Sequence, residues 1–393
     1  MDSLKRAFGL TLMLVACSAV ADDAAMIAEL QEKLRNGPVS SLLFFSQEER
    51  RVTFKSIDQL YPTRKIKAGT VASPLGERPT DLAAVTYELD DVQYTMADFL
   101  QMPYNKGLLV VQDGDVLFER YAPGNDRSTP WMSFSVAKSV TSMLIGAAIR
   151  DGYIASVDEP VANYLPRLRG TPYEASTIRN VLQMASGVAW NEDYNDPDSD
   201  VAKAGAANGL PLVNYLSQLP RQADPGEVFN YSTGETNLVG EILRAAIGNN
   251  ASTYLTHKIW QPYGMESDAT WMTSGVGGVE TGGCCINATL RDYARIGLFA
   301  MSGGVLADGT RVLPDDWMAE SVAPSKGYEG YGYLWWPHGD GAYSARGIFQ
   351  QQIYINPAQR LVIAVHSNAP SAVGSEYGRH LGQLLPAIVR QLD

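Results

Sequence analysis

Hydrophobic and polar positions alternate in residues 107–112 and 116–121, on either side of Asp113-Gly114. A period of two is typical of strands that bury one face, and Asp-Gly between two such runs is the strongest short signal for a hairpin. The pattern therefore predicts a two-stranded antiparallel start to a sheet. A nearly continuous apolar run follows at residues 136–149, which predicts a buried helix that ends at Asp151-Gly152.

The middle of the chain consists of short apolar-periodic segments separated by Pro and Gly, which predicts helices. The expected helices are 161–165, 177–184, 212–219, 236–247 and 251–259, and Thr289-Leu-Arg-Asp292 resembles a capping box that opens a further helix over 290–301. Strand character returns near the end of the chain, and a last helix closes it. These elements are expected at 331–336, 353–355, 361–366 and 378–391.

Strands at both ends of this region, with helices between them, favour an α+β fold. We expect one antiparallel sheet flanked by helices, with an inserted, mostly helical lobe over about 157–300 and an active site between the two parts. The main domain is predicted to span 106–393. Residues 22–105 are expected to form an N-terminal arm, with a helix at 24–35 followed by a stretch rich in Pro and Gly.

The first residues have the layout of a secretory signal, predicted to cover 1–21. Lys5 and Arg6 precede an apolar segment, and small residues at 19–21 come before two aspartates. The segment Leu14-Val15-Ala16-Cys17 also resembles a bacterial lipobox, in which the Cys is lipidated. We therefore expect export to the periplasm or the extracellular space, either as a soluble protein or with a lipid anchor.

Composition narrows the range of partners. The 393 residues carry a net charge of −12, and no cluster of Lys and Arg stands out, so nucleic acid is not expected as a partner. No internal stretch reaches the roughly 18 apolar residues that a transmembrane span needs. After the signal, the cysteines are Cys284 and Cys285, which we expect to be two buried thiols because neighbouring cysteines close only a strained ring. No metal-ligand spacing surrounds them.

The candidate catalytic residues lie at the start of the predicted 136–149 helix, in the segment Ser135-Val-Ala-Lys138. Residues three apart lie on one face of a helix, so the hydroxyl and the amine would be neighbours. A serine is a weak nucleophile unless a base takes its proton, and an amine in a desolvated pocket can lose its charge and serve as that base. The helix amino terminus also favours negative charge that develops on a substrate oxygen.

Several ordered segments together resemble the serine beta-lactamase and penicillin-binding-protein superfamily. The likeness covers about 106–368 and is greatest to the class C-like branch that includes 6-aminohexanoate-dimer hydrolases and related esterases. The matching segments are Ser135-Val-Ala-Lys138, Tyr231-Ser232-Thr233, the stretches 158–166 and 177–187, and Gly282-Gly283 with 291–295.

This resemblance implies roles for individual residues. Ser135 would attack the substrate and form an acyl-enzyme, and Lys138 would accept its proton directly or through Tyr231. The backbone N–H groups of Ser135 and Ile348 would form the oxyanion hole. Substrate contacts are expected from Tyr194, Thr233, Arg346, Gly347 and Asp198, and no cofactor or metal is expected.

Departures from the family pattern shape the expected function. Thr233 stands where the family has Asn, and Ala345-Arg346-Gly347 stands where it has Lys-Thr-Gly, so efficient beta-lactam turnover is not expected. We expect a serine hydrolase of linear amides or short-chain esters. The alternatives are a D-alanyl-D-alanine carboxypeptidase or class C-like beta-lactamase, and a non-catalytic cell-wall binding module. The acidic stretch 191–200 is either a solvated loop or a lid that attracts a substrate ammonium group.

Overall fold

The predicted hairpin forms two strands of a seven-stranded sheet in the computed structural model, which describes residues 22–35 and 42–393. Strand β5 (Asn105–Gln112) pairs antiparallel with β6 (Asp115–Tyr121), and β13 (Leu361–Ser367) pairs with the other side of β5. The C-terminal strands therefore extend the sheet that the hairpin begins. The sheet is completed by β12 (Gln351–Asn356), β11 (Tyr343–Gly347), β10 (Trp336–Pro337) and, parallel to β6, β2 (Gly76–Glu77).

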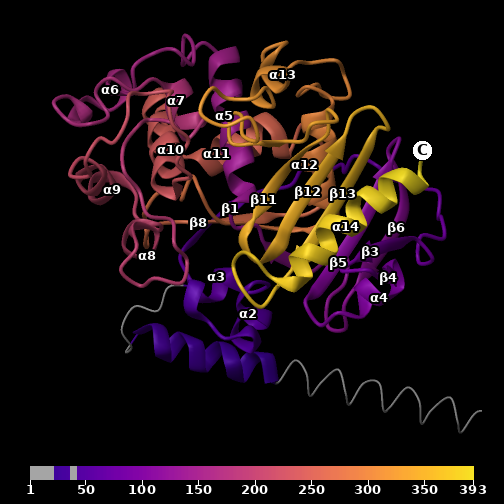
Figure 1. Ribbon diagram of the computed structural model, residues 1–393. Helices are drawn as coiled ribbons and strands as arrows, with labels where there is room; N and C mark the ends of the chain where they lie inside the picture. Colours follow the sequence, from indigo (N-terminus) through magenta and orange to yellow (C-terminus); the bar gives the residue numbers. More distant parts are fainter. Residues whose placement is uncertain (1–21, 36–41) are drawn as a thin grey trace, which may run out of the picture.

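Helices cover both faces of this sheet (Figure 1). Helix α5 (Val136–Arg150) and helix α12 (Leu290–Met301) pack on one face and share a core with Ala345, Ile353 and Val362. Helix α14 (Glu376–Gln391) packs on the other face, against a second apolar cluster. The expected α+β architecture, an antiparallel sheet flanked by helices, is thus confirmed.

A group of helices lies beside the sheet and encloses one side of α5 (Figure 1). It contains α10 (Thr233–Ile247), which packs along α5. The other members are α6 (Val161–Tyr164), α7 (Ile178–Leu182), α8 (Asp200–Ala204), α9 (Gly209–Leu216), α11 (Ala251–Leu255), the 3-10 turn Pro166–Leu168 and the π-helical turn Thr256–Trp260.

A second sheet has four strands. It has the order β1 (Thr63–Ile66), β8 (Ala269–Met272), β9 (Ile286–Thr289) and β7 (Pro130–Met132). Two of its strands come from the stretch where a helical lobe was expected, and α12, from the same stretch, packs on the main sheet. The helical segments of 157–300 therefore do not all lie in one lobe.

The N-terminal residues contribute strands to both sheets. β1 pairs with β8 in the small sheet and β2 pairs with β6 in the main one, so this region is integrated into the domain. Its remaining elements are the helix 22–35, the 3-10 turn Leu42–Phe44, α2 (Gln47–Thr53), α3 (Ile57–Leu60), the ribbon β3 (Thr86–Leu89) with β4 (Val92–Thr95), and α4 (Met96–Gln101).

Most expected elements occur, with shifted ends. Helix α12 has the predicted bounds, and Thr289 caps it by accepting a hydrogen bond from the Asp292 amide. The predicted strand 331–336 is wrong except at its last residue. Its backbone turns instead, because Tyr333 donates its N–H to Ser321 and Leu334, at a φ of 62°, donates to Leu182. Another short helix, α13 (Trp317–Ser321), was not predicted.

The expected signal peptide and the lipobox cysteine lie outside the described residues. Among the helices of the described ranges, none has both the length and the apolar character that crossing a membrane requires.

Substitution of two helical glycines by alanine should have opposite effects on stability. A Cβ at Gly297 of α12 would lie 2.7 Å from a Val362 methyl and 2.8 Å from an Ile353 methyl, whereas a Cβ at exposed Gly382 of α14 would meet nothing within 4 Å. Alanine gains about 1 kcal/mol over glycine in a helix, but overpacking against stiff β-branched side chains costs about 1–3 kcal/mol. Calorimetry should show a lower melting temperature for Gly297→Ala and a higher one for Gly382→Ala. The reverse order would contradict this account of the helix–sheet contact.

Candidate active site

Ser135 lies at the N-terminus of α5, where strand β7 ends. The preceding residues are fixed by the small sheet: Ser133 donates its N–H to Ile286, and its hydroxyl accepts from the Ile286 amide at 2.9 Å. Phe134 has a φ of 44°, and the turn brings Ser135 to the N-cap position. The Ser135 hydroxyl does not cap the helix, and the residue is 8% exposed. The side chain is therefore available for chemistry at the edge of the core.

Lys138 is buried one turn into the same helix and is 1% exposed. Its Nζ donates to the Thr233 hydroxyl at 3.0 Å and lies 5.3 Å from the centre of the Tyr231 ring. A Cβ on Gly283 would come within 2.8 Å of this nitrogen, so the absence of a side chain there makes room for the amine. Burial lowers the pKa of Lys138 to about 8, although the nearby charge of Glu192 raises it in part.

Tyr231 lies beside both the serine and the lysine. Its hydroxyl lies close enough to the Ser135 side chain for that side chain to influence its pKa. Burial, followed by the charge of Glu192, raises the pKa of the Tyr231 phenol above its usual range, and the Ser135 side chain offsets only part of that rise. The ring stacks on Trp336 at 5.8 Å. Tyr231 therefore stays protonated at neutral pH and can carry a proton between neighbours.

Glu192 is a site residue that the sequence did not single out from the other acids of its stretch. Its carboxylate accepts hydrogen bonds from the Thr233 amide at 2.9 Å and from the Tyr194 hydroxyl at 2.8 Å. It also accepts from the Thr233 hydroxyl and from the Trp190 indole. Thr233 thus links Lys138 to a carboxylate by a single hydroxyl, which accepts from the amine and donates to Glu192. No spacing rule marks Glu192, because Thr233, which joins it to Lys138, lies about 40 residues away in the chain.

A tight turn after β11 brings two backbone N–H groups to the same place. A Cβ on Gly347 would lie 3.1 Å from the Ser135 nitrogen and 2.4 Å from the Ser133 oxygen, so this position admits only glycine. Ile348 follows directly, in the 3-10 turn Ile348–Gln350, and Phe349 has a φ of 57°. Within the described chain, no hydrogen bond engages the amide of Ser135 or of Ile348. Both donors remain available to a substrate oxygen.

Three phenylalanines pack behind these two amides. The rings of Phe134 and Phe349, which neighbour Ser135 and Ile348 in sequence, lie 5.2 Å apart. Phe54, from the N-terminal region, contacts both, at 4.8 Å and 5.5 Å. Its carbonyl also accepts from the Met132 amide. The N-terminal region therefore supports the turn that carries the candidate oxyanion hole.

The other expected substrate contacts have varied surroundings. Tyr194 is half-buried and bound to Glu192, and Thr233 is the first residue of α10. Arg346 is exposed on β11, and its guanidinium carbon lies 5.6 Å from the centre of the Trp336 ring.

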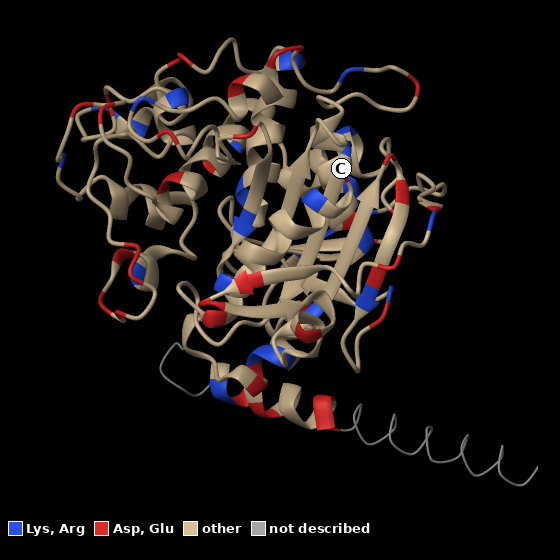
Figure 2. Cartoon of the chain, turned by 45° about the vertical axis from the view of Figure 1, so that its right-hand side comes forward, with Lys and Arg blue, Asp and Glu red and all other residues tan. Residues whose placement is uncertain are grey.

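Acidic residues gather in the loop before α8 (Figure 2). Asp198 there has a side chain that is 86% exposed and paired with Lys203 at 3.3 Å. Asp200 accepts from the Asn191 amide at 2.7 Å and from the Tyr215 hydroxyl at 2.6 Å, so it holds the loop closed. A contact between Asp198 and substrate stays a prediction.

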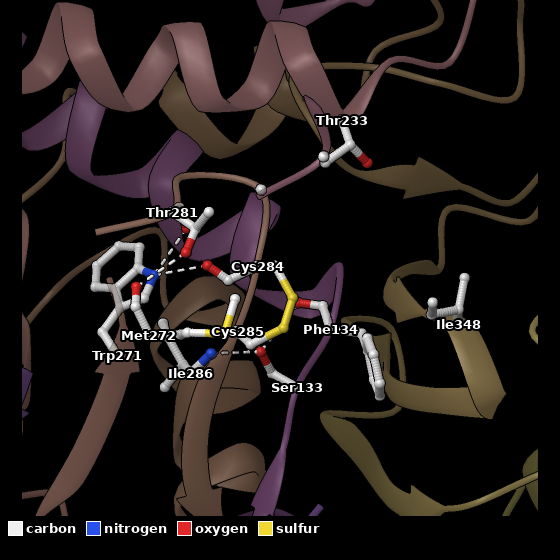
Figure 3. The surroundings of a disulfide bond; sticks show 12 residues. Ser133, Phe134, Thr233, Trp271, Met272, Thr281, Cys284, Cys285, Ile286 and Ile348 are labelled. Atoms are coloured by element: carbon white, nitrogen blue, oxygen red, sulfur yellow. Dashed lines mark hydrogen bonds between the residues drawn. A yellow bond between two sulfur atoms is a disulfide. The ribbon is translucent and has the colours of Figure 1, made fainter. Parts of the chain in front are cut away.

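The expectation of two free thiols is wrong: Cys284 and Cys285 form a disulfide. The turn from Thr281 to Cys284 and two bonds to the cysteine carbonyls, from the Trp271 indole and the Met272 amide, hold the backbone in a form that closes this small ring. Figure 3 shows the pair with Trp271 and Met272 on one side and Phe134 on the other. No loop is stapled. No three potential metal-binding side chains come together in the described ranges.

Comparison with known proteins agrees with this geometry. The profile of the beta-lactamase family matches residues 106–385. The chain belongs to the beta-lactamase family. It is 30% identical over 368 residues to the 6-aminohexanoate-dimer hydrolase of Paenarthrobacter ureafaciens, covering 87% of this chain and 91% of that one. The protein is therefore a beta-lactamase-fold hydrolase that is related to that enzyme.

Solved structures share the fold. A provisionally assigned 6-aminohexanoate-dimer hydrolase from Bacillus anthracis superposes with a TM-score of 0.78 at 21% identity, over 90% of this chain and 99% of that one. A family VIII carboxylesterase gives a TM-score of 0.56 at 15% identity, over 72% and 91% of the two chains. The likeness to this family expected from the motifs is confirmed.

The contact between Glu192 and Thr233 predicts how the Lys138 amine titrates. Because the Glu192 charge raises the pKa of Lys138, Glu192→Gln should lower that pKa further below about 8. The titration can be followed by the ¹³Cε shift in lysine-labelled protein, with Lys138→Arg for assignment. Asp198→Asn removes an exposed charge of the same loop and should leave the titration unchanged. A Lys138 pKa that stays the same or rises in Glu192→Gln would rule out this role.

Proposed function

We propose that this protein is a serine hydrolase of the SxxK type that cleaves linear amide or short-chain ester bonds through an acyl-enzyme on Ser135. The observation that carries the proposal is the convergence of Ser135, Lys138 and Tyr231 beside two free backbone amides. A buried amine with a lowered pKa, a phenol that keeps its proton and a serine at a helix N-terminus are the groups that acyl transfer needs.

The lysine supplies the base in this mechanism. With a pKa of about 8, about one Lys138 amine in ten is neutral at pH 7, against fewer than about one in a thousand for an unperturbed lysine. As the Ser135 oxygen bonds to the substrate carbonyl carbon, its proton passes to Tyr231 while the phenol proton passes to Lys138. The phenol thus transfers a proton without ionising, which fits its raised pKa.

The two backbone amides would hold the oxyanion that this attack creates. The N–H groups of Ser135 and Ile348 face the reacting carbonyl from the end of α5 and from the turn after β11, and a donor of this kind is typically worth about 3–4 kcal/mol in the transition state. When the tetrahedral intermediate collapses, the proton returns through Tyr231 to the departing nitrogen or oxygen. Water then enters, loses a proton along the same path and releases the acid from Ser135.

The proposed substrate class rests on the two departures from the family pattern, at Thr233 and at Ala345-Arg346-Gly347. The Thr233 hydroxyl is engaged by both Lys138 and Glu192 and so is not free to bind a substrate amide. Arg346 replaces a short hydroxyl side chain beside the oxyanion turn. These changes remove groups that hold a beta-lactam but leave the acyl-transfer groups intact. The relationship to a 6-aminohexanoate-dimer hydrolase supports linear amides as substrates, and the carboxylesterase fold neighbour supports esters.

Export belongs to the same proposal. The charged, apolar and small-residue zones of the first 21 residues favour secretion to the periplasm or beyond. A lipid anchor at Cys17 and a soluble mature form are both compatible with that sequence.

Covalent labelling tests the nucleophile. A fluorophosphonate should add once to the protein, and peptide mapping should find the adduct on Ser135, because the helix terminus and the base make that hydroxyl the reactive one. Ser133→Ala is a matched control, since Ser133 lies two residues away with its hydroxyl bound to Ile286. Labelling that persists in Ser135→Ala, or that is absent from the native protein, would defeat the proposal.

The base and the phenol should behave as one unit. Lys138→Ala and Tyr231→Phe should each lower kcat by about 100-fold or more, because either change breaks the same proton path. The double variant should then lose little more than the worse single one. Fully additive losses, measured on a short-chain ester, would show that the two side chains act independently.

A further inference from the structure

The segment 281–285 lies directly against the buried amine of Lys138. A Cβ on Gly283 would come within 2.8 Å of the Lys138 Nζ, so the Gly283 backbone bounds the space that the amine occupies. Cys284 follows Gly283 in the chain and is disulfide-bonded to Cys285. The disulfide therefore begins at the residue next to the one that limits the position of the candidate base.

Hydrogen bonds fix the two ends of this segment to different elements. The Thr141 hydroxyl of α5 donates to the Gly282 carbonyl at 2.7 Å, and the Gly283 amide donates to the Asn237 side chain of α10 at 2.8 Å. The carbonyls of both cysteines accept hydrogen bonds from strand β8. The chain between Gly283 and the cysteine carbonyls thus passes from the helices to the small sheet.

The disulfide holds the backbone between these two sets of hydrogen bonds. Within the described ranges, neither the Gly283 carbonyl nor the Cys285 amide takes part in a hydrogen bond. A bond between neighbouring cysteine side chains closes a small ring that includes the peptide between them, so this peptide cannot rotate while the ring is closed. Figure 3 shows the pair packed between Met272 and Phe134, beside the turn that carries Ser135.

We propose that the Cys284–Cys285 disulfide is a positioning element for the Lys138 amine, because it fixes the Gly283 backbone against that amine, and that its reduction to two thiols loosens the contact. This inference rests on the proposed function, in which Lys138 is the base. Reduction frees the peptide between the cysteines, so Gly283 moves and water reaches the amine. Because burial lowers the pKa of Lys138 to about 8, the pKa then rises toward its ordinary value.

The ionisable groups around the amine are the same in both redox forms. They are Glu192, which acts through the Thr233 hydroxyl, and the Tyr231 phenol. Helix α5 carries no other charge before Arg150. The segment 281–285 contributes only the two thiols after reduction, and thiols in apolar surroundings are neutral at pH 7. A shift in the Lys138 pKa therefore reports a change in burial.

The reduction itself is a two-electron exchange with a dithiol. A thiolate of dithiothreitol attacks the Sγ of Cys284, which is half-buried, whereas Cys285 is fully buried. The bond between the cysteines breaks, and Cys285 leaves with the proton that the attacking thiol lost. The second thiol of the reagent then displaces Cys284, which also takes a proton, and the reagent closes into its own cyclic disulfide.

Titration of Lys138 in the full-length protein tests the proposal. The ¹³Cε shift should give a pKa about one unit higher, or more, after reduction, since the amine is then better hydrated. Short-chain ester hydrolysis at pH 7, measured after the reagent has been removed without air, should fall about tenfold or more because fewer amines are neutral. Above the raised pKa, both forms should approach the same rate, and reoxidation should restore the original profile.

The double variant Cys284→Ser with Cys285→Ser is the matched control, because it cannot form the disulfide. It should show the raised Lys138 pKa without any reagent and should not respond to dithiothreitol. If this variant does not fold, the reduced native protein decides the question, with its fold followed by circular dichroism.

A Lys138 pKa that is equal in the oxidised and reduced proteins would overturn the proposal, because hydrogen bonds alone would then hold Gly283. Unfolding on reduction would overturn it as well, since the disulfide would then hold the fold and not the amine. If labelling shows that Ser135 is not the nucleophile, the proposed function fails, but the amine titration still decides whether the disulfide positions Lys138.

Discussion

The buried amine of Lys138 is the constraint around which the site is built. Every residue of α5 from Val136 to Ala148 is buried, so the lysine stands in the middle of the core rather than at its surface. A cation there loses its hydration, and the loss lowers the pKa of the amine to about 8. The protein tolerates this cost because Thr233 gives the amine a hydrogen bond and Gly283 gives it space. The lowered pKa of this amine is therefore a consequence of how α10 and the 281–285 segment pack on α5.

The candidate oxyanion hole needs a rigid backbone around the amides of Ser135 and Ile348. Part of the packing that holds this backbone comes from residues outside the part of the chain that the family profile matches. That match begins at residue 106, but Phe54 packs against both Phe134 and Phe349. Arg50 also lies over the Phe349 ring, at 4.5 Å, and donates to the Pro370 carbonyl. Both phenylalanines have positive φ, which costs free energy unless packing enforces it. The N-terminal region therefore supplies part of the packing that stabilises the backbone of Phe134 and Phe349, next to the candidate oxyanion hole.

Local signals in the sequence predicted the parts of the fold that depend on neighbouring residues. The Asp113-Gly114 hairpin, the apolar helix behind Ser135 and the Thr289 cap each rest on contacts within a few positions. The start of α10 at Thr233 could have been predicted too, since Ser232 caps the Glu235 amide in the usual spacing.

Contacts between residues far apart in the chain could not be predicted from the sequence. Nothing near β1 indicates that it pairs with β8, about 200 residues away. In the sequence, Glu192 is one of five acids in the stretch 191–200. Its contact with Thr233 distinguishes it from the others, and that residue lies about 40 positions away in the chain. The motif resemblance located Ser135, Lys138 and Tyr231, but it could not show which carboxylate sets the charge of the base. The disulfide at Cys284 and Cys285 depends on a backbone turn that the Trp271 indole fixes from another strand.

The placement of Glu192 is compatible with the proposed role of Lys138 as a base beside a carboxylate. Two unit charges 4 Å apart attract by about 4 kcal/mol at an effective dielectric of 20, and the attraction falls with distance. Direct contact would therefore return the pKa of Lys138 toward its normal value and remove the base. The structure instead inserts the Thr233 hydroxyl between the two groups, so the carboxylate orients the amine while its charge only partly offsets burial. Asp200 and Tyr215 close the loop that holds Glu192 at this separation. The acidic loop would thus influence the protonation of the proposed base through Glu192, while Asp200 fixes the shape of the loop.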